Sequence, residues 1–403
     1  MNMKTTVAVI YGCSSVEHEV SIISAVQAMN NMSKEKYDIV PVYITKKGEM
    51  YTGEDFLNID IYKDTGALKE KSHPVTLVNE DGKVFLKYLD NKFLKKNAPK
   101  QINVIFPIVH GTNCEDGTIS GLCESLRIPY VGCDVLSAAV GMDKAVFKTV
   151  LAAAGLPVLP CTLFSSSDWA ASPDAVIERI ENRMPYPVIV KPVNLGSSVG
   201  ITKAENREEL TDAIELAASF SGKILAEKAI VSLREINCSV LGDSEECEAS
   251  ALEEPIMHDK ILSYKDKYLS SGSKSSKSGG SKGMASLGRQ LPAHLSEEKT
   301  AEIRKIAVEA FKAFGASGVC RIDFLMDCDD NDRVYVNEAN TIPGSLSFYL
   351  WEATGVRYPE LIDRLISLAF KRERKRENLM FTIDTNILDS TPLGSKGAKG
   401  SKF

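Results

Sequence analysis

Two stretches decide the fold: Arg321-Ile-Asp-Phe-Leu-Met-Asp327 and Arg333-Val-Tyr-Val-Asn-Glu-Ala-Asn340. Both are strand-length runs rich in apolar and β-branched residues, so they predict two neighbouring β-strands. Side chains two residues apart share one face of a strand. One face of the second strand is therefore expected to carry Val334, Val336, Glu338 and Asn340.

Three polar side chains on these strands predict a metal site. Asp323, Glu338 and Asn340 could converge as three oxygen ligands. Oxygen-rich sites with carboxylates suit Mg²⁺, especially where substrate phosphates complete the coordination. Ordinary polar residues at strand ends would give the same pattern, so the pattern alone leaves both interpretations open.

A glycine- and serine-rich turn predicts a phosphate site. The strand Pro187-Val-Ile-Val-Lys191-Pro is followed by Asn194-Leu-Gly-Ser-Ser-Val-Gly200. Glycines let backbone amides approach an anion, and a lysine buried at a strand end needs an anionic partner. Lys144, near the start of a helix, is a second candidate. The turn is not a Walker A loop, and a plain hairpin beside surface lysines is the competing interpretation.

Polar residues also follow two earlier strands. Glu17 lies between the first strand and the first helix, and His110 opens the loop that runs to Gly117. Ligands of open α/β sheets bind where strand ends meet helix starts, so acids near Glu17 could hold a substrate ammonium. Lys267-Tyr268 precedes a Ser/Gly/Lys-rich stretch, 270–283, which either closes over a site or is an exposed insertion.

Strand-like and helix-like segments alternate, which predicts an α/β fold. The expected strands are Val7–Tyr11, Tyr37–Tyr43, Asn103–Val109, Lys223–Lys228 and Glu235–Leu241, and the expected helices are Ser21–Met29, Met142–Ala154, Ser296–Gly315 and Pro359–Lys371. The basic run 372–376 that follows the last helix is expected to be a solvated face.

Composition excludes several classes of protein. The chain has 403 residues with a net charge of −6, which argues against broad nucleic-acid binding. No apolar run approaches membrane-spanning length, and the first apolar run is too short for a signal peptide. The nine cysteines form no CxxC pair and indicate reduced thiols in a cytoplasmic protein.

The motifs occur in the order seen in the D-alanine–D-alanine ligase family of the ATP-grasp superfamily, which the chain resembles over about residues 5–370. They are Tyr11-Gly-Cys-Ser-Ser-Val-Glu-His-Glu-Val-Ser21, His110-Gly-x-x-x-Glu-Asp-Gly117, Met142-Asp-Lys144, Val190-Lys-Pro192, Gly196-Ser-Ser-Val-Gly200, Glu227-Lys228, Lys267-Tyr268, Gly318-x-x-Arg-x-Asp323 and Asn337-Glu-Ala-Asn-Thr-x-Pro-Gly344. The resemblance implies a three-domain ATP-grasp fold with an N-terminal parallel sheet. We expect a substrate domain at 1–141, an ATP-grasp lid at 142–226, a catalytic domain at 227–375 and a flexible tail at 376–403.

The resemblance also implies an activity and a role for each site residue. Two D-amino acids would be joined through an acyl phosphate for peptidoglycan synthesis, with ATP and two Mg²⁺ ions, for which Mn²⁺ could substitute, in a cytoplasmic homodimer. Glu17 and His110 would bind the first amino acid, Arg321 and the Gly344 amide the oxyanion, and Asp323, Glu338 and Asn340 the metals. ATP would be bound by Lys144, Lys191, Ser197, Ser198, Glu227, Lys228, Ile230, Glu235 and Lys267, with Ser197 and Tyr268 linked to Glu17.

The chain departs from the family pattern in three places, and the third of them concerns the second substrate. Cys114 replaces the usual glycine, and the loop from Tyr268 to Pro292 is longer and less hydrophobic. The stretch after Gly344 is shorter, so Ser345 or Ser347 is expected to contact the second substrate's carboxylate. The second substrate could be D-alanine, D-lactate or D-serine, and a non-catalytic ATP-binding protein is the rival from another class.

Overall fold

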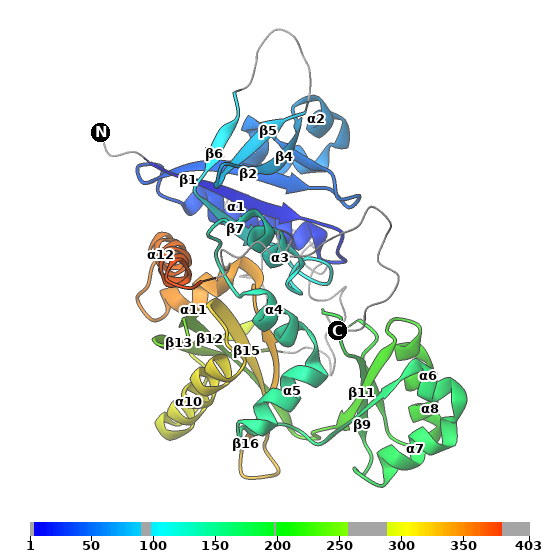
Figure 1. Cartoon of the computed structure of the whole chain (residues 1–403). Coiled ribbons are helices and arrows are strands. Elements are labelled where there is room, and N and C mark those ends of the chain that lie inside the picture. The colour runs from blue at the N-terminus through cyan, green and yellow to red at the C-terminus, as the bar shows by residue number, and fades with distance from the viewer. Residues whose placement is uncertain (1–3, 90–97, 197–198, 257–287, 381–403) are drawn as a thin grey trace, which may run out of the picture.

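The computed structural model describes residues 4–89, 98–196, 199–256 and 288–380. Three β-sheets follow one another along the chain, with helices against each (Figure 1). Their strands span residues 5–108, 161–228 and 233–340. The predicted α/β class is confirmed.

The N-terminal sheet has seven strands in the order β6-β5-β4-β3-β2-β1-β7. β1 is parallel to its neighbours β2 and β7, whereas the remaining pairs are antiparallel. The elements are β1 (Thr5–Gly12), α1 (His18–Asn31), β2 (Tyr37–Ile44), β3 (Met50–Thr52), η1 (Glu54–Leu57), η2 (Ile59–Lys63), α2 (Thr65–Glu70), β4 (His73–Glu80), β5 (Lys83–Tyr88), β6 (Lys100–Ile102), β7 (Val104–Ile108) and α3 (Thr118–Leu126).

Both faces of β1 are buried. Val7, Val9 and Tyr11 belong to a core shared with α1 and the last helix, α12 (Tyr358–Glu377). Ala8 and Ile10 belong to the core on the other face, which α3 covers. A strand buried on both faces is apolar throughout, and the strand was predictable for that reason.

The last helix ties the C-terminal part of the chain to the N-terminal sheet. Arg372 donates to the carbonyl of Gly132 at 2.6 Å and to that of Tyr130, and its guanidinium lies 4.0 Å from the centre of the Tyr130 ring. Arg376 forms an ion pair of 2.7 Å with Glu124. The prediction of a merely solvated basic face is wrong for these two arginines, because α12 continues to Glu377 and lies against the first domain.

The middle sheet has four antiparallel strands in the order β10-β9-β11-β8. Its elements are β8 (Cys161–Ser165), α6 (Ser166–Ala171), α7 (Pro173–Glu181), β9 (Val188–Pro192), β10 (Thr202–Ala204), α8 (Arg207–Ala218) and β11 (Lys223–Lys228). β11 pairs along its whole length with β8 and β9. We therefore propose that the middle unit continues to Lys228.

The third sheet has five strands in the order β14-β13-β12-β15-β16. Its strands are β12 (Leu233–Gly242), β13 (Cys247–Pro255), β14 (Arg289–Gln290), β15 (Gly318–Asp327) and β16 (Arg333–Asn340), and its helices are α10 (Glu297–Ala313), η5 (Gly344–Ser347) and α11 (Phe348–Glu352). Ser296 caps α10 as its sequence predicts, accepting the Lys299 amide at 3.1 Å.

A bulge in β16 corrects the predicted side-chain pattern. Val334 and Val336 lie in the core, together with Ala339. The register shifts so that Asp323 pairs with Glu338 while Phe324 pairs with Val336, which leaves Asn337 as the extra residue. One extra residue reverses the alternation of a strand. Glu338 and Asn340 therefore face away from the core that holds the two valines.

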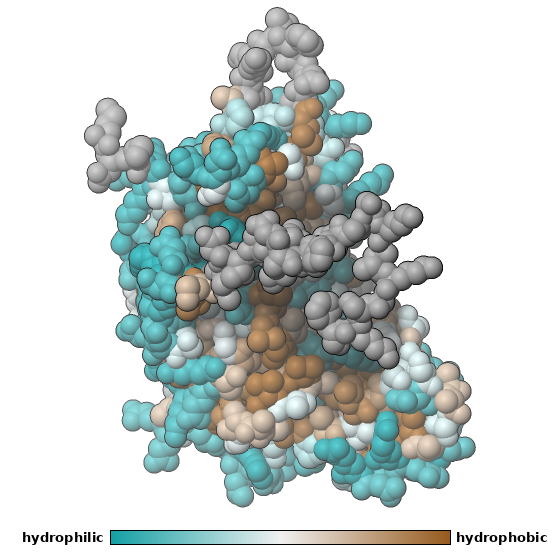
Figure 2. Space-filling view, in the orientation of Figure 1, coloured by the Kyte–Doolittle hydropathy of each residue, from teal (hydrophilic) through white to brown (hydrophobic). Residues whose placement is uncertain are grey.

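The helix predicted at 142–154 corresponds to α5 (Lys144–Ala153), and a separate helix, α4 (Val135–Met142), comes directly before it. α4 ends just before Asp143, which caps α5 by accepting the amides of Ala145 and Val146 at 3.1 and 3.0 Å. Both helices pack against the third sheet. Figure 2 shows apolar residues gathered over these helices, where Leu136 is 72% exposed. In the described ranges, no helix is long and apolar enough to cross a membrane.

Candidate active site

A cavity of about 520 Å³ has walls from all three parts of the fold. It is lined by thirteen of the predicted site residues: Glu17, His110, Lys144, Lys191, Glu227, Lys228, Ile230, Glu235, Arg321, Asp323, Glu338, Asn340 and Gly344. They come from loops after β1, β7 and β11, from α5 and η5, and from strands of the second and third sheets. Residues far apart in sequence thus share one site.

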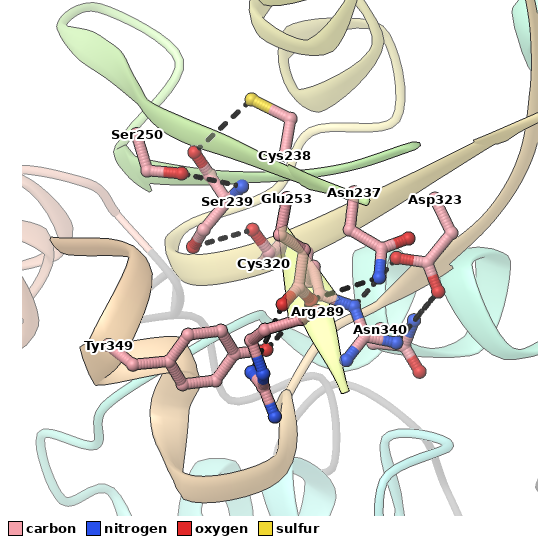
Figure 3. Close-up of polar contacts among 11 residues, drawn as sticks. Asn237, Cys238, Ser239, Ser250, Glu253, Arg289, Cys320, Asp323, Asn340 and Tyr349 are labelled. Carbon is pink, nitrogen blue, oxygen red and sulfur yellow. Dashed lines mark hydrogen bonds and ion pairs between the residues drawn. The ribbon is translucent and has the colours of Figure 1, made fainter. Parts of the chain in front are cut away.

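Arg321 and Asp323 form a pair on β15, and the side chain of each is 14% exposed. The guanidinium binds the carboxylate through two contacts, Nε to Oδ1 at 2.6 Å and Nη2 to Oδ2 at 2.7 Å. Asn340 donates to Oδ2 of Asp323 at 3.0 Å (Figure 3). Burial alone would lower the pKa of Arg321, but the Asp323 carboxylate more than offsets this and the net pKa is well above the usual value. Arg321 therefore stays charged.

Glu338 lies opposite Asp323 on β16 and forms an ion pair of 3.1 Å with Lys144. Burial raises the pKa of Asp323, Arg321 opposes this rise and the charge of Glu338 adds to it. A divalent cation between the two carboxylates would relieve this repulsion, and carboxylate and amide oxygens are suitable Mg²⁺ ligands. In the described part of the chain, no group of three or more His, Cys, Asp or Glu side chains could hold a metal ion. The predicted metal site is of a different kind, because it combines the carboxylates of Asp323 and Glu338 with the side-chain amide of Asn340.

Three lysines surround Glu227 and Glu338. Lys191 forms a hydrogen bond with Glu227, and Lys148 forms an ion pair with Glu227 at 3.0 Å. Burial alone would raise the pKa of Glu227, but Lys148 and Lys191 lower it to about 2. With Lys144, the cluster has one more positive than negative charge, so it would stabilise an anion. Lys148 was missed, although its spacing of four residues from Lys144 places both on one helix face.

The Lys228–Glu235 region forms another part of the cavity wall. Lys228, Ile230 and Glu235 line it beside the apolar side chains of Val231 and Leu233. An apolar wall flanked by polar groups suits a planar heterocyclic base. The predicted adenine-binding role of this segment stays a prediction.

Glu17 lies in a space that two glycines leave open. A Cβ atom added at Gly111 would lie 2.9 Å from Oε2 of Glu17, and one at Gly196 would lie 2.8 Å from it. Gly111 has a φ of 88°, which favours glycine, whereas a side chain at Gly196 would require the Glu17 carboxylate to move. The loops after β1 and β9 meet at this residue.

His110 and Glu115 join the first loop to the third domain. Nδ1 of His110 lies 2.8 Å from the Ile342 carbonyl and Nε2 lies 2.9 Å from Oγ of Ser24. Burial lowers the pKa of His110, so the ring is neutral near pH 7. Glu115 accepts the amides of Gly111 and Ile342 at 3.0 and 2.9 Å. Glu115 also lines the cavity and was missed as a site residue, although it stands in the quoted motif His110–Gly117.

Glu115 predicts a pH dependence of stability. Burial raises its pKa to about 7 from an ordinary value of 4.5. An acid whose pKa is raised in the folded state stabilises the fold below about pH 4.5, and this contribution is lost as the pH rises to about 7. We expect the melting temperature of the wild type, relative to that of Glu115→Gln, to fall over this interval. A difference in melting temperature between the two proteins that stays constant from pH 4.5 to 7 would contradict the raised pKa of Glu115.

Cys114 fits its position without disturbing the loop. Its buried Sγ lies 3.1 Å from the His110 carbonyl and 3.0 Å from that of Gly111. A hydrogen bond with Cys13 and burial together raise its pKa. All nine cysteines are free, as predicted.

Ser345 and Ser347 are not on the cavity wall. Both are buried in a left-handed turn, in which Ser345, Leu346 and Ser347 have φ values of 51°, 55° and 50°. Oγ of Ser347 has no hydrogen-bond partner among the described residues. The structure thus does not bring these serines to the site. The predicted Ser197, Ser198, Lys267 and Tyr268 lie outside the described residues.

Known proteins match the chain over nearly its full length. Family models described as D-ala D-ala ligase N-terminus and C-terminus match residues 6–133 and 150–367. A D-alanine–D-alanine ligase of Caldicellulosiruptor bescii is 41% identical over 389 residues, which is 94% of this chain and 99% of the relative. One of Bacillus cytotoxicus is 38% identical over 392 residues, with coverage of 94% and 99%.

Solved structures show the same relationship. The D-alanine–D-alanine ligase of Coxiella burnetii has a TM-score of 0.76 and 32% identity, and the match covers 93% of this chain and 96% of that one. The VanG D-Ala:D-Ser ligase of Enterococcus faecalis has a TM-score of 0.74 and 30% identity, with coverage of 91% and 100%.

Proposed function

The chain belongs to the D-alanine–D-alanine ligase family, and on this premise we propose that it joins two D-alanine molecules at the expense of ATP. The product would serve the synthesis of peptidoglycan precursors in the cytoplasm. One observation carries the proposal: a single cavity brings the lysine cluster around Glu227 together with the paired acids Asp323 and Glu338. Cations for phosphates and oxygen ligands for a metal are what phosphoryl transfer to a carboxylate requires.

The proposed reaction has two steps. A carboxylate oxygen of the first D-alanine attacks the γ-phosphorus of ATP, so that an O–P bond forms while the bond to the ADP oxygen breaks. The amine of the second D-alanine then attacks the carbonyl carbon of the acyl phosphate. A C–N bond forms, the C–O bond to phosphate breaks, and the amine loses a proton as phosphate leaves.

Residues of this chain suit each requirement. Asp323, Glu338 and Asn340 would hold two Mg²⁺ ions, or Mn²⁺ in their place, which would neutralise phosphate charge when bound. Lys144 and Lys191 would bind phosphate oxygens, and Lys148 keeps Glu227 ionised and in place.

Groups around the reacting carboxyl would orient it. Glu17 would bind the ammonium of the first D-alanine, with the neutral His110 beside it. Arg321 and the amide of Gly344 would stabilise the oxyanion of the tetrahedral intermediate, an effect of about 3–4 kcal/mol for one donor in a known enzyme. Ser197, Tyr268 and Lys267 keep their predicted roles as part of this proposal.

A second candidate concerns the second substrate. The serines expected to bind its carboxylate are away from the cavity, and one structural relative is titled a D-Ala:D-Ser ligase. D-Serine or D-lactate could therefore replace the second D-alanine. Phosphate release should be measured with a panel of acids and amines. Release with D-alanine alone supports the proposal, whereas release only with D-alanine plus another acceptor supports the second candidate.

We also propose a homodimer, with no role for nucleic acid or membrane. The exposed apolar residues over α4 and α5 would suit a contact between copies. Light scattering that gives the mass of a single chain would contradict the dimer.

A further inference from the structure

Four polar side chains at one part of the cavity wall have no role in the proposed reaction. They are Asn237 on β12, Glu253 on β13, Arg289 on β14 and Tyr349 on α11 (Figure 3). ATP, the metal ions and the first amino acid are assigned to other walls. The amine donor still needs a binding site, and these residues line the same cavity.

The sheet places this cluster in line with the metal-binding acids. Glu338 pairs with Asp323 across β16 and β15, Asp323 with Asn237 across β15 and β12, and Asn237 with Glu253 across β12 and β13. Paired residues point to the same face, and neighbouring strands lie about 4.8 Å apart. Glu253 is therefore about 10 Å from Asp323. On the edge strand β14, Arg289 pairs with Pro255, which lies two residues from Glu253 on the same face of β13.

Glu253 fixes the orientation of Arg289. Oε1 of Glu253 accepts hydrogen bonds from the Tyr349 hydroxyl at 2.8 Å and from the Asn237 amide at 3.0 Å. Oε2 pairs with Nη1 of Arg289 at 3.0 Å. The guanidinium also lies 4.2 Å from the centre of the Tyr349 ring. A guanidinium held by an ion pair and a stacked ring has little freedom left to lose when a ligand binds.

The chemistry of such a cluster points to a carboxylate ligand. The side chain of Glu253 is 5% exposed and that of Arg289 is 15% exposed. A buried ion pair adds little stability compared with apolar packing, so stability alone does not account for it. The planar guanidinium fork has five N–H donors and can serve two carboxylates at once. In an α-amino acid one carbon separates the amine from the carboxylate, so a carboxylate anchor must adjoin the oxyanion-stabilising groups.

We propose that Arg289, positioned by Glu253 and Tyr349, binds the α-carboxylate of the second amino acid. The Tyr349 ring lines the cavity beside the Arg289 guanidinium, so we expect it to favour an acceptor with a small side chain. The inference rests on the proposed ligase function and replaces the role expected of Ser345 and Ser347.

The test compares Arg289→Ala and Arg289→Lys with the wild type. Steady-state kinetics with D-alanine separate the KM of the first amino acid from that of the second. For Arg289→Ala we expect the second KM to rise about 30-fold or more, while the first KM and the KM of ATP change less than about twofold. Arg289→Lys keeps the positive charge but loses the planar guanidinium. Its KM for the second amino acid should therefore lie between those of the wild type and Arg289→Ala.

Arg234→Ala is the matched control. Arg234 forms a similar pair with Glu254, at 2.8 and 2.6 Å, in the same sheet but away from the cavity wall. It should change stability without raising the second KM selectively. A second readout replaces the acceptor with D-alaninamide: the wild type should prefer D-alanine strongly, and Arg289→Ala should lose that preference.

The outcomes separate this inference from the proposed function. Hydroxylamine trapping of the acyl phosphate should be retained in Arg289→Ala. An unchanged second KM, or an equal rise of both KM values, overturns the role of Arg289 while the ligase function stands. A wild type that releases no phosphate with D-alanine overturns the proposed function itself.

Discussion

Asp323→Asn should lower kcat on the order of 10³-fold or more. The carboxylate is the proposed metal ligand and also holds Arg321 through two contacts of 2.6 and 2.7 Å. Loss of its charge would weaken metal binding and release the guanidinium from its position. The measurement is phosphate release at saturating ATP and D-alanine over a range of Mg²⁺ concentrations.

A change at Asp323 also removes a buried ion pair, so stability must be followed separately. Glu254→Gln is a suitable control, because it breaks a similar pair with Arg234 in the same sheet but away from the cavity. We expect this control to melt at a lower temperature and yet keep wild-type turnover. Normal turnover of a folded Asp323→Asn protein would disprove the metal assignment.

Lys191→Met should lower kcat/KM for ATP about 10²-fold or more. The lysine lies in the cluster that carries excess positive charge, and burial lowers its pKa despite the opposing charge of Glu227. Removing it takes away a cation for phosphate, while Lys148 still neutralises Glu227. Loss of stability should therefore be small.

Lys223→Met on β11 is the control for this prediction. Lys223 belongs to the same sheet, but its side chain is 62% exposed and pairs with Asp143 at 3.0 Å. Calorimetric titration with ATP should show weak binding to Lys191→Met and normal binding to Lys223→Met. Equal ATP affinities for the wild type, Lys191→Met and Lys223→Met would show that Lys191 does not bind the phosphates.

Much of the fold was predictable, because long apolar runs and capped helices have strong local signals. The bounds predicted for Lys223–Lys228 match β11, and those of the second quoted stretch match β16. The bulge at Asn337 was not predictable, since the period-two rule assumes regular pairing and the extra residue is defined only against β15. The helix α4 was not predicted, and the helix predicted from Met142 began two residues before α5, although Asp143 ahead of a helical run is a local start signal.

The site was predictable where its residues stand in short motifs. Glu17, His110, Arg321 and Asp323 carry such signals, and the structure brings them to one cavity. The group of Asn237, Glu253, Arg289 and Tyr349 was missed because its members come from four separate segments. They come together only through the pairing of the strands and the packing of α11, so no short sequence pattern could have predicted the cluster.

The most direct test of the central claim is the product of the reaction. Purified protein should be incubated with ATP, Mg²⁺ and D-alanine. The dipeptide should then be identified by mass spectrometry, and the amounts of dipeptide, ADP and phosphate should be measured. We predict one D-alanyl-D-alanine for each ADP and phosphate released. ATP binding without dipeptide or phosphate, with D-alanine or with any other amino acid, would show that the chain is a nucleotide-binding protein and not a ligase.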